Sequence, residues 1–249
     1  VVDRHGLDAI VAIGGEGTMG VVRDLHHDGV PVVGVPKTID NDIAETEMTF
    51  GFQTAVQICT DAIDRLHTTA ESHHRILVVE VMGRHVGHIA VWAGLAGGAT
   101  FTLVPEEPFD IADVAERIVS RHRAGSWATI VVVAEGAVPA PGTIEVVAPA
   151  VDRYGHEVLG GIAHVVAAEL QERTGMESRT TVLGHVQRGG SPVAFDRVLA
   201  TRFGIAAVDA VADRAFGDMV ALQSGRIVRV KVDDAIVTLG VMEVGADGI

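Results

Sequence analysis

Short apolar runs alternate with amphipathic stretches along almost all of the 249 residues. The apolar runs are rich in β-branched residues and occupy residues 7–13, 31–35, 75–82, 129–134 and 180–183, with another at 226–232. Such runs are typical of strands that are buried on both faces. Gly14-Gly15 follows the first run and Pro36 follows the second, so we expect these residues to end their strands.

Between the runs, apolar residues recur at every third or fourth position, which predicts helices that bury one face. The clearest case covers residues 49–70, where the apolar stripe comprises Phe52, Val56, Cys59, Ile63 and Leu66. Shorter helices are predicted over residues 19–26, over 233–239, and from residue 111 onward with Asp110 as the cap. Another helix follows Ser191-Pro192, and its stripe comprises Val198, Phe203, Ile205 and Val208.

This alternation predicts an α/β fold, in which mainly parallel sheets are covered by helices on both faces. Ligands in such folds bind just outside the carboxyl ends of the strands. The residues that directly follow each strand are therefore the first candidates for a functional site. Residues 137–154, rich in Pro, Gly and Ala, are predicted to form a surface excursion or a linker, and 244–249 a frayed tail.

Composition narrows the classes of protein that fit this pattern. The chain has 19 Lys and Arg against 33 Asp and Glu, a formal net charge of −14, which disfavours nucleic acid and anionic membrane as partners. No apolar run is long enough to span a bilayer. Cys59 is the single cysteine, which excludes a disulfide framework and fits a reducing compartment. On its apolar stripe, Cys59 is expected to be a core residue.

The first candidate motif is Gly14-Gly15-Glu16-Gly17-Thr18, at the end of a predicted strand. Glycines let a backbone approach an anion closely, and the start of a helix offers N–H groups that have no partner within the helix. Glu16 fits such a turn if it holds Mg²⁺ on a phosphate. The alternative is an ordinary tight turn whose Glu is stabilised by the helix dipole.

The second candidate motif is Pro36-Lys37-Thr38-Ile39-Asp40-Asn41-Asp42, directly after the next predicted strand. Two carboxylates, Asp40 and Asp42, can divide the work of removing a proton and orienting a metal or water. Lys37 adds a cation suited to a polyphosphate, and Thr38 adds a hydroxyl. The alternative is a loop whose Asp side chains bond their own backbone. We favour the functional interpretation because of the glycine motif nearby.

Cationic side chains also occur close to strand ends in this acidic chain: Arg75, Arg84, Arg179, His185 and Arg188. Arginine presents forked donors that match phosphate oxygens, so these residues predict specific anion sites; ion pairs with Asp and Glu are the alternative. Glu135 follows another strand, where it could accept bonds from sugar hydroxyls or simply be solvated. The 12 histidines show no zinc-site spacing, and we expect surface or helix-end positions for them.

Together these segments closely resemble the phosphofructokinase family. The motifs in family order are the glycine turn at 14–18, the Pro-Lys-Thr-Ile-Asp-Asn-Asp loop at 36–42, the stretch from Thr49 through Arg65 to Arg75, Val-Glu-Val-Met-Gly-Arg at 79–84 and Leu-Gly-His-Val-Gln-Arg-Gly-Gly-Ser-Pro at 183–192. The resemblance implies two Rossmann-like, three-layer α/β domains. It assigns residues 1–51 and 187–237 to a donor-binding domain, and 52–186 and 238–249 to a sugar-phosphate-binding domain.

The resemblance also implies a reaction, the phosphorylation of the 1-hydroxyl of fructose 6-phosphate in glycolysis. Asp40 would be the base, Thr38 and Asp42 would support it and the metal, and Arg84 would stabilise the transferred group. The donor would contact Gly15, Glu16, Gly17, Thr18 and Lys37, with Mg²⁺ at Glu16, where better-known members carry Asp. The sugar would contact Met82, Gly83 and Glu135, and its 6-phosphate His185 and Arg188.

Two features concern the assembly and the donor. Arg75 and Arg179 correspond to arginines that reach the 6-phosphate of a neighbouring subunit, which implies at least a homodimer and, from the family, a tetramer. Gly17 resembles the ATP-dependent form, whereas Lys37 resembles the pyrophosphate-dependent form. We expect ATP, because a small residue at position 17 leaves room for adenosine. The family and the composition together imply a cytoplasmic location.

Family members begin with a further strand and a glycine-rich loop that contacts the donor. We therefore expect the chain to be an N-terminally truncated subunit that binds donor poorly, with reduced or no activity. Two other interpretations stay open: a non-catalytic ligand-binding subunit, against which the intact Asp40 and Arg84 argue, and a lipid or NAD kinase that shares the glycine turn. The latter does not explain the 36–42 loop.

Overall fold

The computed structural model describes residues 2–144, 150–151, 157–158 and 160–241. The tail predicted at 244–249 and much of the irregular stretch at 137–154 lie outside these residues. The chain divides into two compact units, the first formed by residues up to Thr54 with Ser191–Gly240, and the second by Ala55–Gly190. The observed divisions thus fall after residues 54, 190 and 240, compared with the expected 51, 186 and 237.

The first unit is built on a mixed sheet with the strand order β1-β2-β10-β11, and β3 also pairs with β2. The pairs β1–β2, β2–β3 and β2–β10 are parallel, whereas β10 and β11 form an antiparallel hairpin. The strands are β1 (Ile10–Gly14), β2 (Val32–Thr38), β3 (Phe50–Gly51), β10 (Asp218–Gln223) and β11 (Arg226–Lys231). The helices are α1 (Val2–His5), α2 (Glu16–His27), α7 (Ala194–Ala212) and α8 (Val232–Ala235), together with the start of α3 (Phe52–His73).

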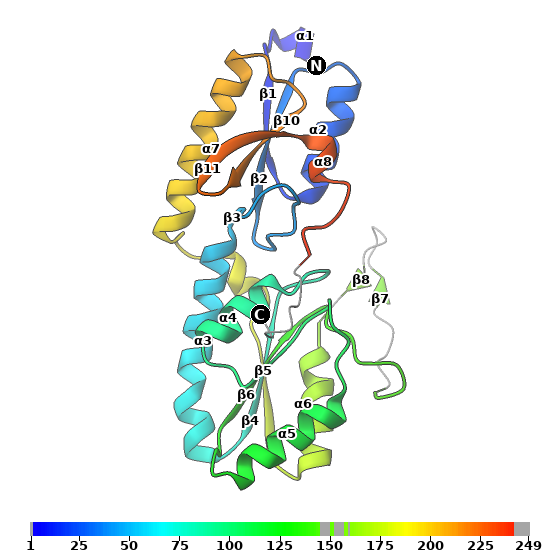
Figure 1. Cartoon of the computed structure of the whole chain (residues 1–249), viewed down its shortest axis with the longest axis vertical. Helices are drawn as coiled ribbons and strands as arrows, with labels where there is room; N and C mark the ends of the chain where they lie inside the picture. Colours follow the sequence, from blue (N-terminus) through cyan, green and yellow to red (C-terminus); the bar gives the residue numbers. More distant parts are fainter. Residues whose placement is uncertain (1, 145–149, 152–156, 159, 242–249) are drawn as a thin grey trace. The chain divides into compact units, whose positions relative to one another are not determined.

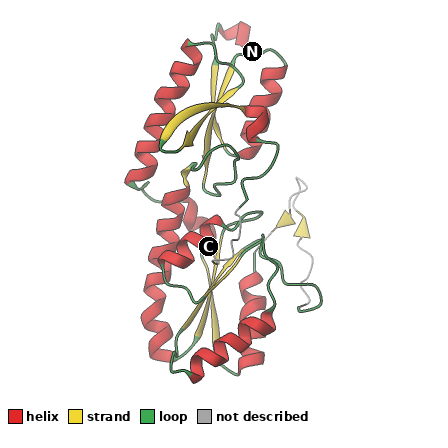
Figure 2. Cartoon of the chain, in the orientation of Figure 1, coloured by secondary structure: helices red, strands yellow, loops and turns green. Residues whose placement is uncertain are grey.

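Both faces of this sheet are covered by helices (Figure 2). Alternate residues of β2 point to opposite faces, so Val32 packs in one cluster with Met19 of α2, and Val33 in another with Phe203 of α7. The centre of the sheet is therefore buried on both sides, as the apolar runs predicted.

The second unit is built on a parallel sheet with the strand order β5-β6-β4-β9 (Figure 1). Its strands are β4 (Ile76–Val81), β5 (Phe101–Leu103), β6 (Thr129–Ala134) and β9 (Ser178–Val182), with a short antiparallel pair of β7 (Ala150–Val151) and β8 (Glu157–Val158). The remaining elements are most of α3, α4 (His88–Ala96), α5 (Ile111–Arg123), α6 (Ile162–Thr174) and the 3₁₀ turn η1 (Gly184–Arg188).

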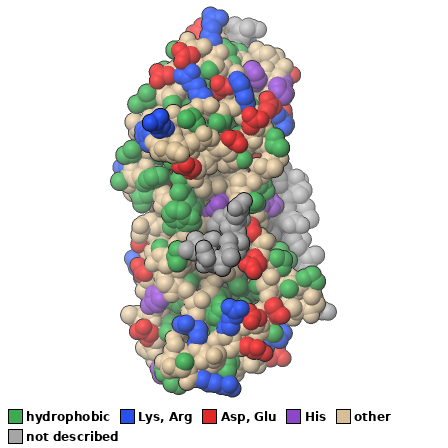
Figure 3. Space-filling model, in the orientation of Figure 1, with side chains coloured by type: hydrophobic (Ala, Val, Ile, Leu, Met, Phe, Trp, Pro, Cys, Tyr) green, Lys and Arg blue, Asp and Glu red, His purple; other side chains and the backbone are tan. Residues whose placement is uncertain are grey.

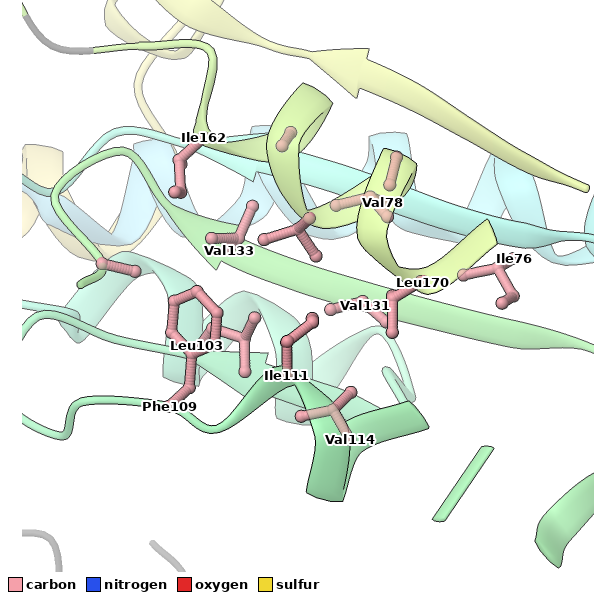
Figure 4. Packing of buried hydrophobic residues seen from close by; sticks show 14 of the residues in the cluster. Ile76, Val78, Leu103, Phe109, Ile111, Val114, Val131, Val133, Ile162 and Leu170 are labelled. Carbon is pink, nitrogen blue, oxygen red and sulfur yellow. The ribbon is translucent and has the colours of Figure 1, made fainter. Parts of the chain in front are cut away.

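One part of the core of the second unit lies between this sheet and helices α5 and α6. Ile76 and Val78 of β4 and Val131 of β6 pack against Ile111 and Leu170 there (Figure 4). The predicted helix cap is confirmed, because the Asp110 carboxylate accepts a hydrogen bond from the Ala112 N–H at 2.8 Å.

Several expectations from the sequence were wrong in detail. Pro36 does not end its strand: β2 continues to Thr38, and Pro36 lies where the partner of β2 changes from β10 at Gly34 to β3 at Lys37. The helix predicted at 233–239 is the short α8, and those predicted at 19–26 and 49–70 are α2 and α3, which begin at Glu16 and Phe52.

The stripe predicted on α7 was also wrong. Val198, Ile205 and Val208 are 59%, 61% and 64% exposed, and of the predicted stripe only Phe203 is buried, together with Leu199, Ala207 and Ala210. Both sides of this helix are apolar, so the periodicity did not identify the buried one. The segments not predicted from the sequence include α4, α6, β5, η1 and the strand β10 in the interior of its sheet.

Candidate active site

The glycine motif and the Thr38 loop meet at the carboxyl ends of β1 and β2. Gly14 is buried, and a Cβ at this position would collide with the side chain of Thr18. Gly15 is the N-cap of α2, and a Cβ there would lie 3.5 Å from the Cβ of Thr38. The absence of a side chain at Gly14 therefore makes room for Thr18 in the first turn of α2, and Gly15 lies in ordinary contact distance of Thr38 at the end of β2.

Helix α2 begins earlier than the sequence predicted, and this changes the role of the motif. Glu16, Gly17 and Thr18 form the first turn of the helix, and the first backbone bond runs from the Met19 N–H to the Gly15 carbonyl. The N–H groups of a first turn have no acceptor within the helix, and they carry the positive end of its dipole. Glu16 and Gly17 are exposed, and a Cβ on Gly17 would meet no atom within 4 Å. This turn has the chemistry of an anion site with open space beside it.

Thr38 and Asp40 form a hydrogen-bonded pair just after β2. The Thr38 hydroxyl accepts a bond from the Asp40 N–H at 3.1 Å and donates to the Asp40 carboxylate at 3.4 Å. Both side chains are half-buried, whereas Lys37 is exposed. The backbone carbonyl of Asp42 accepts a bond from the Gly240 N–H at 2.8 Å, which fixes the far end of the motif.

Asn41 holds this loop in shape, although the sequence interpretation gave it no role. Its backbone is left-handed, with φ of 55°, and its side chain is buried. The Asn41 side-chain oxygen accepts a bond from the Thr49 N–H at 2.8 Å, and its amide nitrogen donates to the Glu47 carbonyl at 3.2 Å. The Thr49 hydroxyl donates in turn to the Thr38 carbonyl at 2.9 Å. An Asn between two Asp residues was the available signal, because Asn adopts left-handed backbone more readily than most residues.

In the second unit, the carboxyl ends of β4 and β6 are joined by backbone hydrogen bonds. The Glu135 N–H donates to the Val81 carbonyl at 2.9 Å, and the Gly136 N–H donates to the Gly83 carbonyl at 3.0 Å. Gly83 has φ of 141°, and a Cβ there would lie 2.6 Å from the Val86 carbonyl oxygen. Met82, Gly83 and Glu135 are thus neighbours at one edge of the sheet, just beyond the carboxyl ends of two adjacent parallel strands.

The turn η1 brings His185 and Arg188 to the same edge. It follows β9, whose neighbour is β4, and the Leu183 N–H donates to the Glu80 carbonyl at 3.0 Å. His185 and Arg188 are both exposed, as is Arg84 beyond β4. The second unit therefore gathers a carboxylate, a histidine and two arginines at the ends of three strands.

Arg75 and Arg179 lie at the opposite end of the same sheet. Arg75 precedes the first residue of β4, and Arg179 is the second residue of β9. A strand rises about 3.3 Å per residue, so about 20 Å of chain separates Arg75 from Met82. Both arginines form ion pairs with Glu177, at 2.6 Å from the Arg75 Nε. The structure thus does not place these two arginines with His185 and Arg188 of the same chain.

Glu80 is a second residue that the sequence interpretation missed. It is 3% exposed near the carboxyl end of β4, and its carboxylate accepts bonds from the Gly161 N–H at 2.9 Å and the Ala163 N–H at 3.0 Å. A carboxylate there satisfies N–H groups at the start of α6 and interacts favourably with the dipole of that helix. The signal was a single charged residue within an otherwise apolar run.

Charged side chains are mixed over the molecular face in Figure 3, where Lys and Arg are interspersed with Asp and Glu. Within the described ranges, no group of three or more His, Cys, Asp or Glu side chains is placed to hold a metal. In that same part of the chain, no helix combines the length and the apolar character needed to cross a membrane.

Comparison with known proteins gives one consistent family. The family model for phosphofructokinase matches residues 1–211. A pyrophosphate–fructose 6-phosphate 1-phosphotransferase from Amycolatopsis methanolica is 59% identical over 239 residues, which cover 96% of this chain and 70% of that protein. An ATP-dependent 6-phosphofructokinase from Corynebacterium efficiens is 54% identical over 94% of this chain and 68% of that protein. Among solved structures, phosphofructokinase from Saccharomyces cerevisiae matches with a TM-score of 0.77 and 32% identity, over 94% of this chain and 33% of that one.

Proposed function

Since the chain belongs to the phosphofructokinase family, we propose that it transfers a phosphoryl group to the 1-hydroxyl of fructose 6-phosphate, giving fructose 1,6-bisphosphate. The family consists of phosphotransferases, and the reaction belongs to glycolysis; we propose that it takes place in the cytoplasm. The observation that carries the proposal is the Thr38–Asp40 pair beside the first turn of α2. This arrangement combines a carboxylate base with an anion site in one unit.

Asp40 is the proposed base of the reaction. Its carboxylate takes the proton of the 1-hydroxyl as the sugar oxygen forms a bond to phosphorus and the bond from phosphorus to the donor oxygen breaks. Thr38 orients Asp40 through the hydrogen bonds described above, and Asp42 supports the same loop. Arg84 supplies positive charge that stabilises the transferred group. Positioning and charge stabilisation account for most of the catalysis of phosphoryl transfer.

The first turn of α2 is the proposed site for the donor phosphates. Its N–H groups and Lys37 supply positive charge, Gly15 and Gly17 leave the backbone accessible, and Thr18 lies in the same turn. Mg²⁺ is held in such sites by one or two carboxylates together with substrate phosphates, and Glu16 supplies an exposed carboxylate of this kind. When bound, the ion neutralises charge on the phosphate oxygens.

The edge of the second unit is the proposed site for the sugar phosphate. Met82, Gly83 and Glu135 contact the sugar in this proposal, and His185 and Arg188 bind its 6-phosphate. Arg75 and Arg179 serve the 6-phosphate of a neighbouring copy. Their position at the other end of the sheet, about 20 Å away along β4, supports this assignment. The site then requires at least a homodimer, and we propose a tetramer.

We propose ATP as the phosphoryl donor, supported by the open space beside Gly17. Pyrophosphate is the second candidate. It is favoured by the exposed Lys37 and by the relative of 59% identity, whose name specifies pyrophosphate. The ATP-dependent relative from Corynebacterium efficiens has a lower sequence identity to this chain, 54%.

Product analysis tests both parts of this proposal. The protein is expressed from its full coding sequence and incubated with fructose 6-phosphate, Mg²⁺ and either ATP or pyrophosphate, and phosphorus NMR identifies the products. We expect fructose 1,6-bisphosphate with ATP. Turnover with pyrophosphate and none with ATP would overturn the proposed donor alone. No bisphosphate with either donor would overturn the proposed reaction.

A further inference from the structure

Gln187 is buried within an exposed turn. Only 1% of its surface is accessible, whereas Val186 and Arg188 on either side are exposed. Its side-chain oxygen accepts bonds from the Met82 N–H at 3.0 Å and the Cys59 thiol at 3.1 Å, and its amide nitrogen donates to the Gly184 carbonyl at 2.9 Å. One side chain therefore connects α3, the end of β4 and η1, all within the second unit.

The bond to Met82 is formed where the sheet ends. The ladder between β4 and β9 runs as far as the pair of Glu80 and Val182, and Met82 is the first residue beyond β4. In place of a strand neighbour, Gln187 provides the acceptor for the Met82 N–H. The segment Met82–Gly83 thus takes its position from η1 as well as from β6.

Gln187 also orients the two side chains of η1 that are proposed to bind phosphate. Residues three apart in a 3₁₀ helix lie on the same side, so His185 and Arg188 share one side of the turn. Gln187 occupies the inward side, and its bond to Gly184 fixes the start of the turn. The placement of Gln187 therefore determines which side of η1 carries His185 and Arg188. It also determines how far these two residues lie from Met82.

Cys59 completes this arrangement as a donor. It is fully buried in α3, and burial raises the pKa of its thiol to about 12, so the proton stays on the sulfur at neutral pH. The oxygen of Gln187 then accepts two bonds at once, from Met82 and from Cys59. A side-chain amide whose oxygen and nitrogen both form hydrogen bonds has little freedom to rotate.

We propose that Gln187 is a positioning residue for sugar-phosphate binding: it holds the His185–Arg188 turn in register with Met82 and Gly83. This inference rests on the proposed function, because it assumes that these residues bind the sugar phosphate. It assigns Gln187 no contact with the substrate and no part in donor binding.

The test replaces the amide without changing side-chain length. Gln187→Met removes all three hydrogen bonds. Gln57→Met makes the same change on the exposed side of α3, where the Gln57 amide donates to the Asp61 carboxylate at 2.7 Å. Gln187→Asn keeps the amide but shortens its reach, and it carries the test if the Met variant does not fold. We expect the Kd and KM for fructose 6-phosphate to rise about tenfold or more in both Gln187 variants, with the Kd for the donor changed less than about twofold. Gln57→Met should match the unaltered protein.

Two results would overturn the inference. One is unchanged fructose 6-phosphate affinity in a folded Gln187 variant, and the other is an equal loss of affinity for sugar phosphate and donor. Hydrogen exchange provides a readout that does not depend on the substrate: the Met82 amide should lose protection in Gln187→Met and keep it in Gln57→Met. If the unaltered protein does not bind fructose 6-phosphate, the proposed function fails, and the exchange of Met82 still decides whether Gln187 holds the two segments together.

Discussion

In the first unit the side chain of Asn41 bonds to residues of its own loop, whereas in the second unit the side chain of Gln187 joins residues from distant parts of the chain. Asn41 reaches Glu47 and Thr49, a few positions along the same loop. Gln187 reaches Met82 and Cys59, from which it is separated by 105 and 128 positions. The first loop is bonded to Leu222 and Gly240 as well, so both sites need packed elements, but only in the second does one buried side chain join three of them.

The largest expected effect is on the chemistry assigned to the first unit. Asp40→Asn keeps the size of the side chain but removes the carboxylate that we propose takes the proton. We expect turnover to fall by about 10²–10⁴-fold, the usual contribution of a general base. Glu47→Gln provides a control on the exposed part of the same loop. Steady-state rates of bisphosphate formation measure the effect, and a variant with unaltered turnover would exclude Asp40 as the base.

The next effect tests whether the first site depends on its own loop. Asn41→Ala loses the bonds to Thr49 and Glu47 and places Ala in a left-handed backbone conformation. The free energy of unfolding should fall by about 2–4 kcal/mol, from lost hydrogen bonds and from backbone strain. Asn41→Gly removes the bonds without the strain and should lose less. Urea unfolding compares the two, and equal losses would contradict a role for the left-handed backbone.

A smaller effect concerns the packing of the second unit. Because burial raises the pKa of the Cys59 thiol to about 12, very little thiolate exists at neutral pH. We expect the native protein to react with a thiol reagent at least about 100-fold more slowly than the urea-unfolded protein. Cys59 is the only cysteine, so the signal has one source. Rapid labelling of the native protein would show that the contact with Gln187 opens readily.

The smallest effect is a pH dependence of stability from His122 in α5. Burial lowers the pKa of His122, with a further contribution from the charge of His74. The unfolded chain therefore takes up a proton at His122 before the folded chain does as the pH falls below about 6.5. The contribution of His122 to the free energy of unfolding is fully present above about pH 6.5 and decreases below it. Urea unfolding from pH 8 to pH 5.5 should show a shallower decline for His122→Gln than for the unaltered protein; a steeper decline would contradict the assignment.

The residues of the first site were easier to group from the sequence than those of the second, because the side-chain bonds of Thr38 and Asn41 lie within one short stretch. Thr38, Asp40 and the glycine turn follow strands in one short stretch, and the structure brings them together. The partners of Gln187 and Glu80 lie in other elements, and no pattern within η1 or β4 identifies them. Their chemistry still gave a signal, since a polar side chain in a buried setting requires hydrogen-bond partners.

The helices were also predicted correctly only where their own sequence distinguishes the buried side from the exposed side. The stripe on α3 was predicted correctly for Phe52, Val56 and Ile63, which are buried, because the opposite side of that helix is polar. Helix α7 is apolar on both sides, so its buried side depends on which one meets the sheet. Strand β10 was missed although Ser224-Gly225, both with positive φ, forms a turn between two apolar runs. Such a turn is a hairpin signal.

The central claim is that recognition of the sugar phosphate belongs to the second unit and activation of its hydroxyl to the first. Calorimetric titration of fructose 6-phosphate into Asp40→Asn and into Arg188→Met tests it directly. The account predicts that Asp40→Asn binds within about twofold of the unaltered protein, while Arg188→Met, which loses a charge-assisted bond to phosphate, binds about tenfold or more weakly. Equal affinities in the two variants, or weaker binding by Asp40→Asn, would contradict the claim.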